Sequence, residues 1–168
     1  VVCGARCRDQ NRGDPPGVSV VIPERGTPDL LDDALSGAVA AGTALGEPVQ
    51  YIVVVNGAAE EDYAALRMRY PQVEWQFHAG PLGYNGAIAA GMRGVRHDWT
   101  YLLNSDMRLD VRALVEVSRY RQAQVFAITS QIFFSDTSRR REETGWSDFH
   151  WNPRVPEVYE RSIEEGDL

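Results

Sequence analysis

Lysine is absent from this chain of 168 residues, and all 17 of its basic residues are arginines. A Schiff-base lysine and the lysine of a P-loop are therefore excluded, together with the mechanisms that depend on them. Acidic residues outnumber basic ones by 24 to 17, which gives a net charge of −7. A chain with this balance is a poor partner for nucleic acid, so we expect no nucleic-acid partner.

Cysteines and long apolar runs are also scarce. Cys3 and Cys7 are spaced C-x₃-C without a nearby histidine or second cysteine pair, which disfavours a zinc site. Both lie in residues 1–17, which lack the apolar stretch of a signal peptide and are expected to form a flexible leader. The longest apolar runs, 18–22 and 51–55, fall far below the ~20 residues of a membrane helix. We therefore expect no transmembrane segment, and a cytoplasmic chain that could lie peripheral to a membrane.

The sequence does carry the pattern of an α/β protein. Hydrophobic residues make up 43% of the chain, which is typical of a globular domain. Strands are predicted at 18–22, 50–55, 73–77, 99–103, 124–128 and 131–134. Helices are predicted from Thr27 or Asp29 to Gly46, from the acidic turn at 60–62 to Pro71, and at 84–95 and 110–121. This alternation predicts a mostly parallel sheet with helices on both faces, whose ligands bind at the carboxyl ends of the strands.

Polar or turn residues follow three of these strands. The first strand ends in Pro23, the second in Asn56-Gly57, and strand 99–103 continues into the tip Asn104-Ser105-Asp106. A carboxylate at such a tip can bind Mg²⁺ or Mn²⁺, which use few protein ligands and take the others from a substrate diphosphate. Asp106 is thus the candidate metal ligand, with capping of the next turn as the alternative.

Four segments follow one another in a characteristic order: VSVVIP at 18–23, IVVVNG at 52–57, PLGYNGAIAAG at 81–91 and YLLNSD at 101–106. Their order and spacing resemble the nucleotide-sugar glycosyltransferases of the GT-A fold, specifically the inverting family 2, over residues 17–135. The resemblance implies transfer of a sugar from a nucleotide-diphosphate donor, a UDP-sugar, to an acceptor hydroxyl with inversion. It also implies a Mn²⁺ or Mg²⁺ ion that neutralises the diphosphate.

The resemblance places the base of the donor near the ends of the first two strands. Pro23, Glu24 and Arg25 stand where the family usually has a loop with an aromatic residue. Arg25 could stack on the nucleobase instead of that ring, or it is a solvated surface arginine. Asn56 could read the imide edge of uracil through its amide; its alternative is an ordinary Asn-Gly turn.

The diphosphate and sugar are expected further along the chain. Gly83 opens helix 84–95, whose first backbone amides would face the diphosphate. Asn104 and Ser105 are assigned to the donor side, where Asn104 would hydrogen-bond the ribose or sugar; a simple turn residue is the alternative. Asp110 is interpreted as a helix N-cap rather than a second metal ligand.

Sugar transfer also needs a carboxylate that takes the acceptor proton. In the family this base usually lies beyond the donor-binding core, and the late acids Asp148, Glu142 and Glu143 are the candidates, with Asp148 first. The neighbouring arginines 139–141 could complement phosphate and Trp146 could stack on a sugar, although a solvated loop explains the same charge run.

These assignments divide the chain into a leader at 1–17, a donor-binding core at 18–135, and a partial acceptor-side region or tail at 136–168. The predicted function is a metal-dependent glycosyltransferase acting on a glycan, lipid or protein acceptor. A nucleotide-sugar-binding module, or a truncated or inactive transferase without an acceptor lobe, remains the alternative. A nucleotidyltransferase is disfavoured because the loop at 23–27 is short and acidic.

Overall fold

The computed structural model describes residues 17–122, 124–135, 146–150 and 157–161. The chain divides into two compact units, Val1–Thr129 and Ser130–Leu168. The first carries every predicted donor-side residue, and each unit is described by itself. The predicted leader lies outside the described residues except for Gly17.

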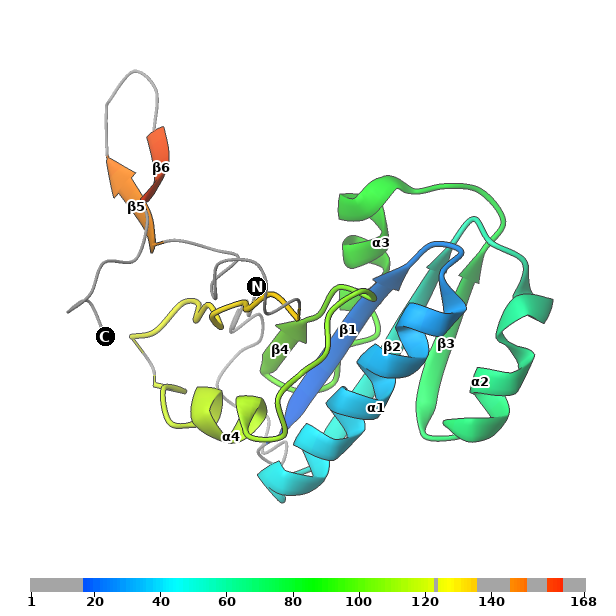
Figure 1. Ribbon diagram of the computed structural model, residues 1–168, viewed down its shortest axis with the longest axis horizontal. Coiled ribbons are helices and arrows are strands. Elements are labelled where there is room, and N and C mark those ends of the chain that lie inside the picture. Colours follow the sequence, from blue (N-terminus) through cyan, green and yellow to red (C-terminus); the bar gives the residue numbers. More distant parts are fainter. Residues whose placement is uncertain (1–16, 123, 136–145, 151–156, 162–168) are drawn as a thin grey trace. The chain divides into compact units, whose positions relative to one another are not determined.

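Four strands form the sheet of the first unit, and all of them run parallel (Figure 1). They are β1 (Val18–Glu24), β2 (Val49–Asn56), β3 (Val73–His78) and β4 (Trp99–Leu102). Their order across the sheet is β3-β2-β1-β4, so β1 is central and Val20 pairs with Tyr51 on one side and Tyr101 on the other. Runs of valine and isoleucine suit strands that are buried on both faces. The four predicted strands and the parallel α/β class are confirmed.

Helices connect the strands. They are α1 (Pro28–Leu45), the 3₁₀ turn η1 (Glu60–Tyr63), α2 (Ala64–Arg69), α3 (Gly83–Met92) and α4 (Ala113–Ser118). Pro28 occupies the first turn of α1, and Gly46 ends it at φ +70°, a conformation that glycine adopts without steric cost. Helix α4 is shorter than the predicted 110–121 helix, because Asp110 accepts a hydrogen bond from Arg112 N in a turn that precedes it.

Helices cover both faces of the sheet, as predicted. Val20 and Ile22 of β1 pack on one face with the buried residues of α1, whereas Val21 packs on the other face with α3. This alternation is the two-residue repeat of a strand. The first face also buries Tyr63 of η1 and Leu114 of α4, so α1, η1, α2 and α4 share it.

Small side chains let α3 approach the sheet closely. Ala87, Ala90 and Gly91 are buried there, and a Cβ placed on Gly91 would lie 2.5 Å from Val21 Cγ1. These small residues allow α3 to pack closely on the sheet, whereas Ala89 of the same helix is exposed.

The predicted strands at 124–128 and 131–134 are wrong. Over the described part of 119–135 the backbone forms only isolated bridges, at Ile128 and Phe133. A core strand needs to bury its apolar side chains, but Phe126 is 74% exposed. In the second unit, β5 (Trp146–His150) and β6 (Glu157–Arg161) form an antiparallel pair.

Candidate functional site at the carboxyl ends of the parallel strands

The order of the strands defines where a ligand is expected to bind. The chain builds β1, β2 and β3 side by side and then returns across the sheet to place β4 on the free side of β1. The connections therefore diverge between β1 and β4, and ligands of open parallel sheets bind at the carboxyl ends of strands beside such a point. Glu24 and the tip 104–106 lie at these two ends.

On the α1 side of this edge, Glu24 is buried and its carboxylate is engaged by the protein itself. It accepts hydrogen bonds from Thr27 N at 2.5 Å, from Thr27 Oγ1 at 3.1 Å and from the Tyr63 hydroxyl at 3.0 Å. The same hydroxyl accepts a hydrogen bond from Gly26 N at 3.0 Å. Glu24 and Tyr63 thus fix the turn that joins β1 to α1, and the predicted donor contact of Glu24 would act through this turn.

Arg25 projects from this fixed turn. Its side chain is exposed and makes no hydrogen bond or ion pair with another described residue, while Pro23 is buried within β1. Gly26 follows at φ +75°, a left-handed conformation that reverses the chain directly after Arg25. A guanidinium held at the sheet edge in this way is available to a base or to a phosphate.

Burial raises the pKa of the Tyr63 hydroxyl to about 12, because a phenolate would lose its hydration there. The Gly26 N–H opposes this shift, and the neighbouring Glu24 carboxylate adds to it. Tyr63 therefore stays neutral at ordinary pH, and its hydroxyl donates a hydrogen bond to Glu24.

On the α3 side, Asn56 ends β2 and is only 5% exposed. Its Oδ1 accepts a hydrogen bond from Leu82 N at 2.5 Å, and its Nδ2 donates to Gly83 O at 3.3 Å. Both ends of the amide are thus engaged by the backbone that leads into α3. Reading of a base edge by Asn56 stays a prediction, and it would require a ligand to share or replace these two partners.

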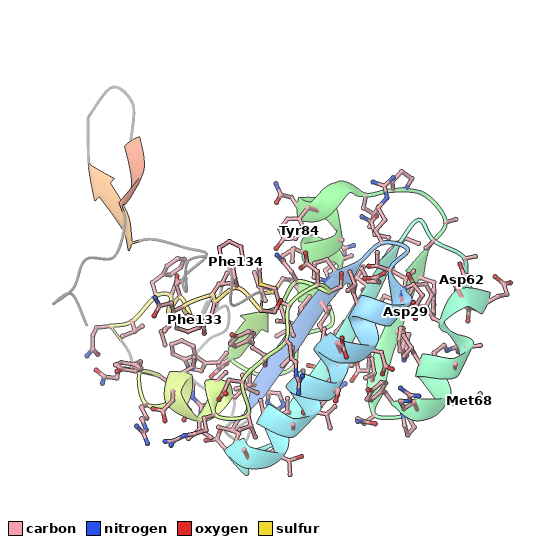
Figure 2. The ribbon with its side chains drawn as sticks, viewed as in Figure 1. Asp29, Asp62, Met68, Tyr84, Phe133 and Phe134 are labelled. Atoms are coloured by element: carbon pink, nitrogen blue, oxygen red, sulfur yellow. The ribbon has the colours of Figure 1, made fainter. Side chains whose placement is uncertain are left out.

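Asn104 follows β4 on the same side and meets the first turn of α3. The Tyr84 hydroxyl donates a hydrogen bond to Asn104 Oδ1 at 2.9 Å, and Figure 2 shows Tyr84 projecting from the start of α3. The Asn104 carbonyl accepts from Met107 N at 3.2 Å, which tightens the tip of β4. Tyr84, which directly follows Gly83 in the chain, therefore connects the start of α3 to Asn104.

Asp106 ends this tip with an exposed carboxylate that has no hydrogen bond or ion pair to the rest of the described chain. Ser105 beside it is half-buried. Within the described ranges no three histidine, cysteine or acidic side chains lie close enough to hold a metal ion. Asp106 therefore fits a cation that takes one protein carboxylate and completes its shell with substrate oxygens and water.

Three residues of this region are not apparent as site candidates from the sequence. His78 is the last residue of β3, and its Nε2 is buried without a partner in the described structure. Tyr63 and Tyr84 lie on helical segments without a distinctive motif. The one sequence signal that Tyr84 carries is its position directly after the glycine that opens α3.

Asp148 lies in β5, where it pairs with Tyr159 of β6. Its side chain lies outside what the structure describes, as do Glu142, Glu143 and the arginines 139–141. Its role as a base stays a prediction.

Comparison with known proteins supports the fold rather than a particular function. No protein-family model matches the chain, and no curated protein matches it. Among solved structures, S. aureus TarS superposes with a TM-score of 0.52 at 12% identity over 61% of this chain and 19% of that chain. A second structure, S. aureus TarS 1-349, gives 0.52 at 13% identity over 61% of this chain and 31% of that chain.

This likeness shows a glycosyltransferase-like α/β fold of the GT-A type. The chain spans 19% of the length of the first of these solved chains and 31% of the second. No helix among the described residues is long and apolar enough to cross a membrane.

Proposed function

We propose that this chain binds a nucleotide-diphosphate sugar, with UDP as its nucleotide, and belongs to a transferase that moves the sugar to an acceptor hydroxyl with inversion. The observation that carries the proposal is the arrangement of side chains at the carboxyl ends of β1 and β4, where the connections between strands diverge. Asn104, Asp106 and the start of α3 converge there at the carboxyl ends of a GT-A-like sheet. Such edges bind ligands in parallel α/β proteins, and the sequence resemblance supplies the class of ligand.

A divalent cation, Mn²⁺ or Mg²⁺, is part of the proposal. The chain and a diphosphate are both negative, so their association needs charge compensation. Asp106 offers one free carboxylate, and when bound the ion would neutralise the leaving diphosphate. Because one carboxylate is a weak site alone, we expect cation and diphosphate to bind together.

Thermal unfolding with UDP, GDP and ADP, each with and without Mn²⁺, tests donor binding. Ligand at 100 times its dissociation constant should add roughly 2.7 kcal/mol of stability. UDP with Mn²⁺ should give the largest shift, and Asp106→Ala should remove it without changing the ligand-free midpoint. Asp98→Ala is the matched control, because Asp98 is an exposed aspartate at the opposite end of β4.

Absence of stabilisation by every nucleotide would refute the proposal. Full Mn²⁺-dependent stabilisation of Asp106→Ala would instead remove Asp106 from the site while leaving nucleotide binding intact. These two outcomes separate the function from the residue assigned to it.

A nucleotide-sugar-binding module without transfer is the second candidate. It is favoured by the concentration of Glu24, Asn56, Gly83, Asn104 and Asp106, all predicted donor-side residues, in the unit Val1–Thr129. Released nucleotide and glycosylated product, followed separately with a mixed panel of glycan, lipid and protein acceptors, distinguish the two. Transfer that is lost in Asp148→Asn while UDP binding persists would support Asp148 as the base.

A further inference from the structure

The start of α3 links the ends of two strands that are not neighbours. Asn56 of β2 holds the backbone at Leu82 and Gly83, and Tyr84, the next residue, reaches Asn104 after β4. Strand β1 lies between β2 and β4 in the sheet, so this link spans the end of the central strand. The turn is held from one side by a buried amide and ends in an exposed hydroxyl on the other.

The Tyr84 hydrogen bond holds one end of the Asn104 amide and leaves the other end free. An asparagine side chain has one acceptor oxygen and one amide nitrogen with two N–H donors. Its Oδ1 is occupied by the Tyr84 hydroxyl at 2.9 Å, while Nδ2 makes no hydrogen bond to the described chain. Asn104 is therefore left with its donor group free, next to the carboxylate of Asp106.

We propose that Tyr84 is a positioning residue that holds the Asn104 side chain at this edge, where its free Nδ2 donates to an oxygen of the bound nucleoside diphosphate. The inference rests on the proposed function and deepens it by naming a residue that positions a ligand contact. Without the hydroxyl the Asn104 side chain loses the contact that holds it in this position, and ligand binding then has to order it.

Core packing does not account for Tyr84. Its side chain is 55% exposed, and the Asn56 contacts already anchor the backbone before it. Removing the hydroxyl should therefore leave the stability of the free protein unchanged while altering ligand binding. This difference separates positioning from a merely structural role.

The test is a double-mutant cycle on binding of UDP with Mn²⁺, measured by calorimetry, for Tyr84→Phe, Asn104→Ala and the double variant. We expect Tyr84→Phe to weaken binding about 3- to 10-fold, the range of one neutral hydrogen bond. The double variant should bind no more weakly than Asn104→Ala alone, because the hydroxyl acts only through the amide. Uridine without phosphate is the second probe, and loss of the effect with uridine assigns the contact to a phosphate oxygen rather than to the ribose.

Tyr120→Phe is the control, since Tyr120 is an equally exposed tyrosine that lies outside this edge of the sheet. In the free protein, the NMR signal of the Asn104 side-chain amide, identified by its loss in Asn104→Ala, should move in Tyr84→Phe and stay in Tyr120→Phe. The inference would be overturned, without affecting the proposed function, by any one of three results. These are an unmoved amide signal in Tyr84→Phe, an unchanged UDP affinity in Tyr84→Phe, and additive losses of affinity in the double variant. Failure of the wild-type chain to bind any nucleotide would overturn the proposed function and this inference with it.

Discussion

Deletion of one buried hydroxyl, Tyr63→Phe, should destabilise the protein in a way that depends on pH. The hydroxyl donates to Glu24 and accepts from Gly26 N, both at 3.0 Å. Phenylalanine keeps the ring, which packs against Trp75 and Phe77 with centroids 6.0 and 6.1 Å away. The variant therefore removes two hydrogen bonds and leaves the aromatic packing in place.

The cost follows from what is left unpaired. Glu24 is 1% exposed and keeps only its Thr27 donors, and the Gly26 N–H loses its acceptor. Leaving such groups without partners costs about 1 to 3 kcal/mol. At about 4 °C per kcal/mol for a domain of this size, the melting temperature should fall by roughly 4 to 12 °C.

The pH dependence of the difference has a definite sign. The folded protein raises the pKa of Tyr63 from its ordinary value of 10.0 to about 12, so the stability linked to its proton is complete below pH 10 and is lost as the pH rises toward 12. By pH 11 the wild type should have lost about 1.4 kcal/mol of this contribution, which Tyr63→Phe never had. The difference in unfolding free energy between wild type and Tyr63→Phe should therefore be smaller at pH 11 than at pH 8 by that amount.

Urea unfolding at pH 8 and pH 11 measures both effects. Tyr51→Phe is the matched control, because the Tyr51 hydroxyl is buried but only reaches the Ala38 carbonyl at 3.4 Å and bonds no carboxylate among the described residues. A loss at pH 8 that is no larger in Tyr63→Phe than in Tyr51→Phe would refute the argument that the hydroxyl secures the turn. A difference in unfolding free energy between wild type and Tyr63→Phe that stays constant up to pH 11 would refute the raised pKa of Tyr63.

Three further changes test the packing around the sheet. Tyr70 and Arg69 lower the pKa of Asp32, so Asp32→Asn should cost under about 1 kcal/mol at pH 7, and the difference from wild type should vanish as the pH falls below that lowered pKa in acid unfolding. Gln50→Leu should cost about 2 to 4 kcal/mol in urea unfolding, since Gln50 bonds Ser19, Gly94 and Arg96 N at the amino ends of the strands, yet UDP affinity should be unchanged. Gly91→Ala should lower the free energy of unfolding by about 1 to 3 kcal/mol, because its Cβ would meet Val21 Cγ1. Gly80→Ala is its control and should leave that free energy unchanged, because a Cβ there meets nothing within 4 Å. Equal effects of the two changes would contradict the close approach of α3 to the sheet.

The sheet could be predicted from the sequence because its signals are local. Short apolar runs that end in proline, asparagine or aspartate mark β1, β2 and β4, and small residues mark α3. The segment 124–134 misled the same reasoning, since its phenylalanines resemble a strand in composition while Phe126 remains exposed. Burial is decided by tertiary packing, and the local pattern did not contain that information.

The partners of the site residues could not be predicted, because they come from distant parts of the chain. Asn56 was correctly placed at the end of a strand, but its bonds to Leu82 and Gly83 bridge 26 and 27 positions. The Glu24 carboxylate is reached by Tyr63 over 39 positions. Such contacts depend on the order of the strands, which residue spacing alone does not determine.

The polar groups at the carboxyl edge fall into two sets with different consequences for binding. On the α1 side, Glu24 and Tyr63 satisfy one another, so a ligand gains nothing from Glu24 directly and that side acts by shaping the turn at Arg25. On the α3 side, Asn104 and Asp106 keep a free donor and a free carboxylate among the described residues. One of these groups suits an anionic oxygen and the other suits a cation, and a diphosphate with its metal ion presents both within a few ångströms. The pairing of opposite polarities on one strand tip, rather than either residue alone, is therefore the strongest physical argument for a nucleotide-diphosphate ligand at this edge.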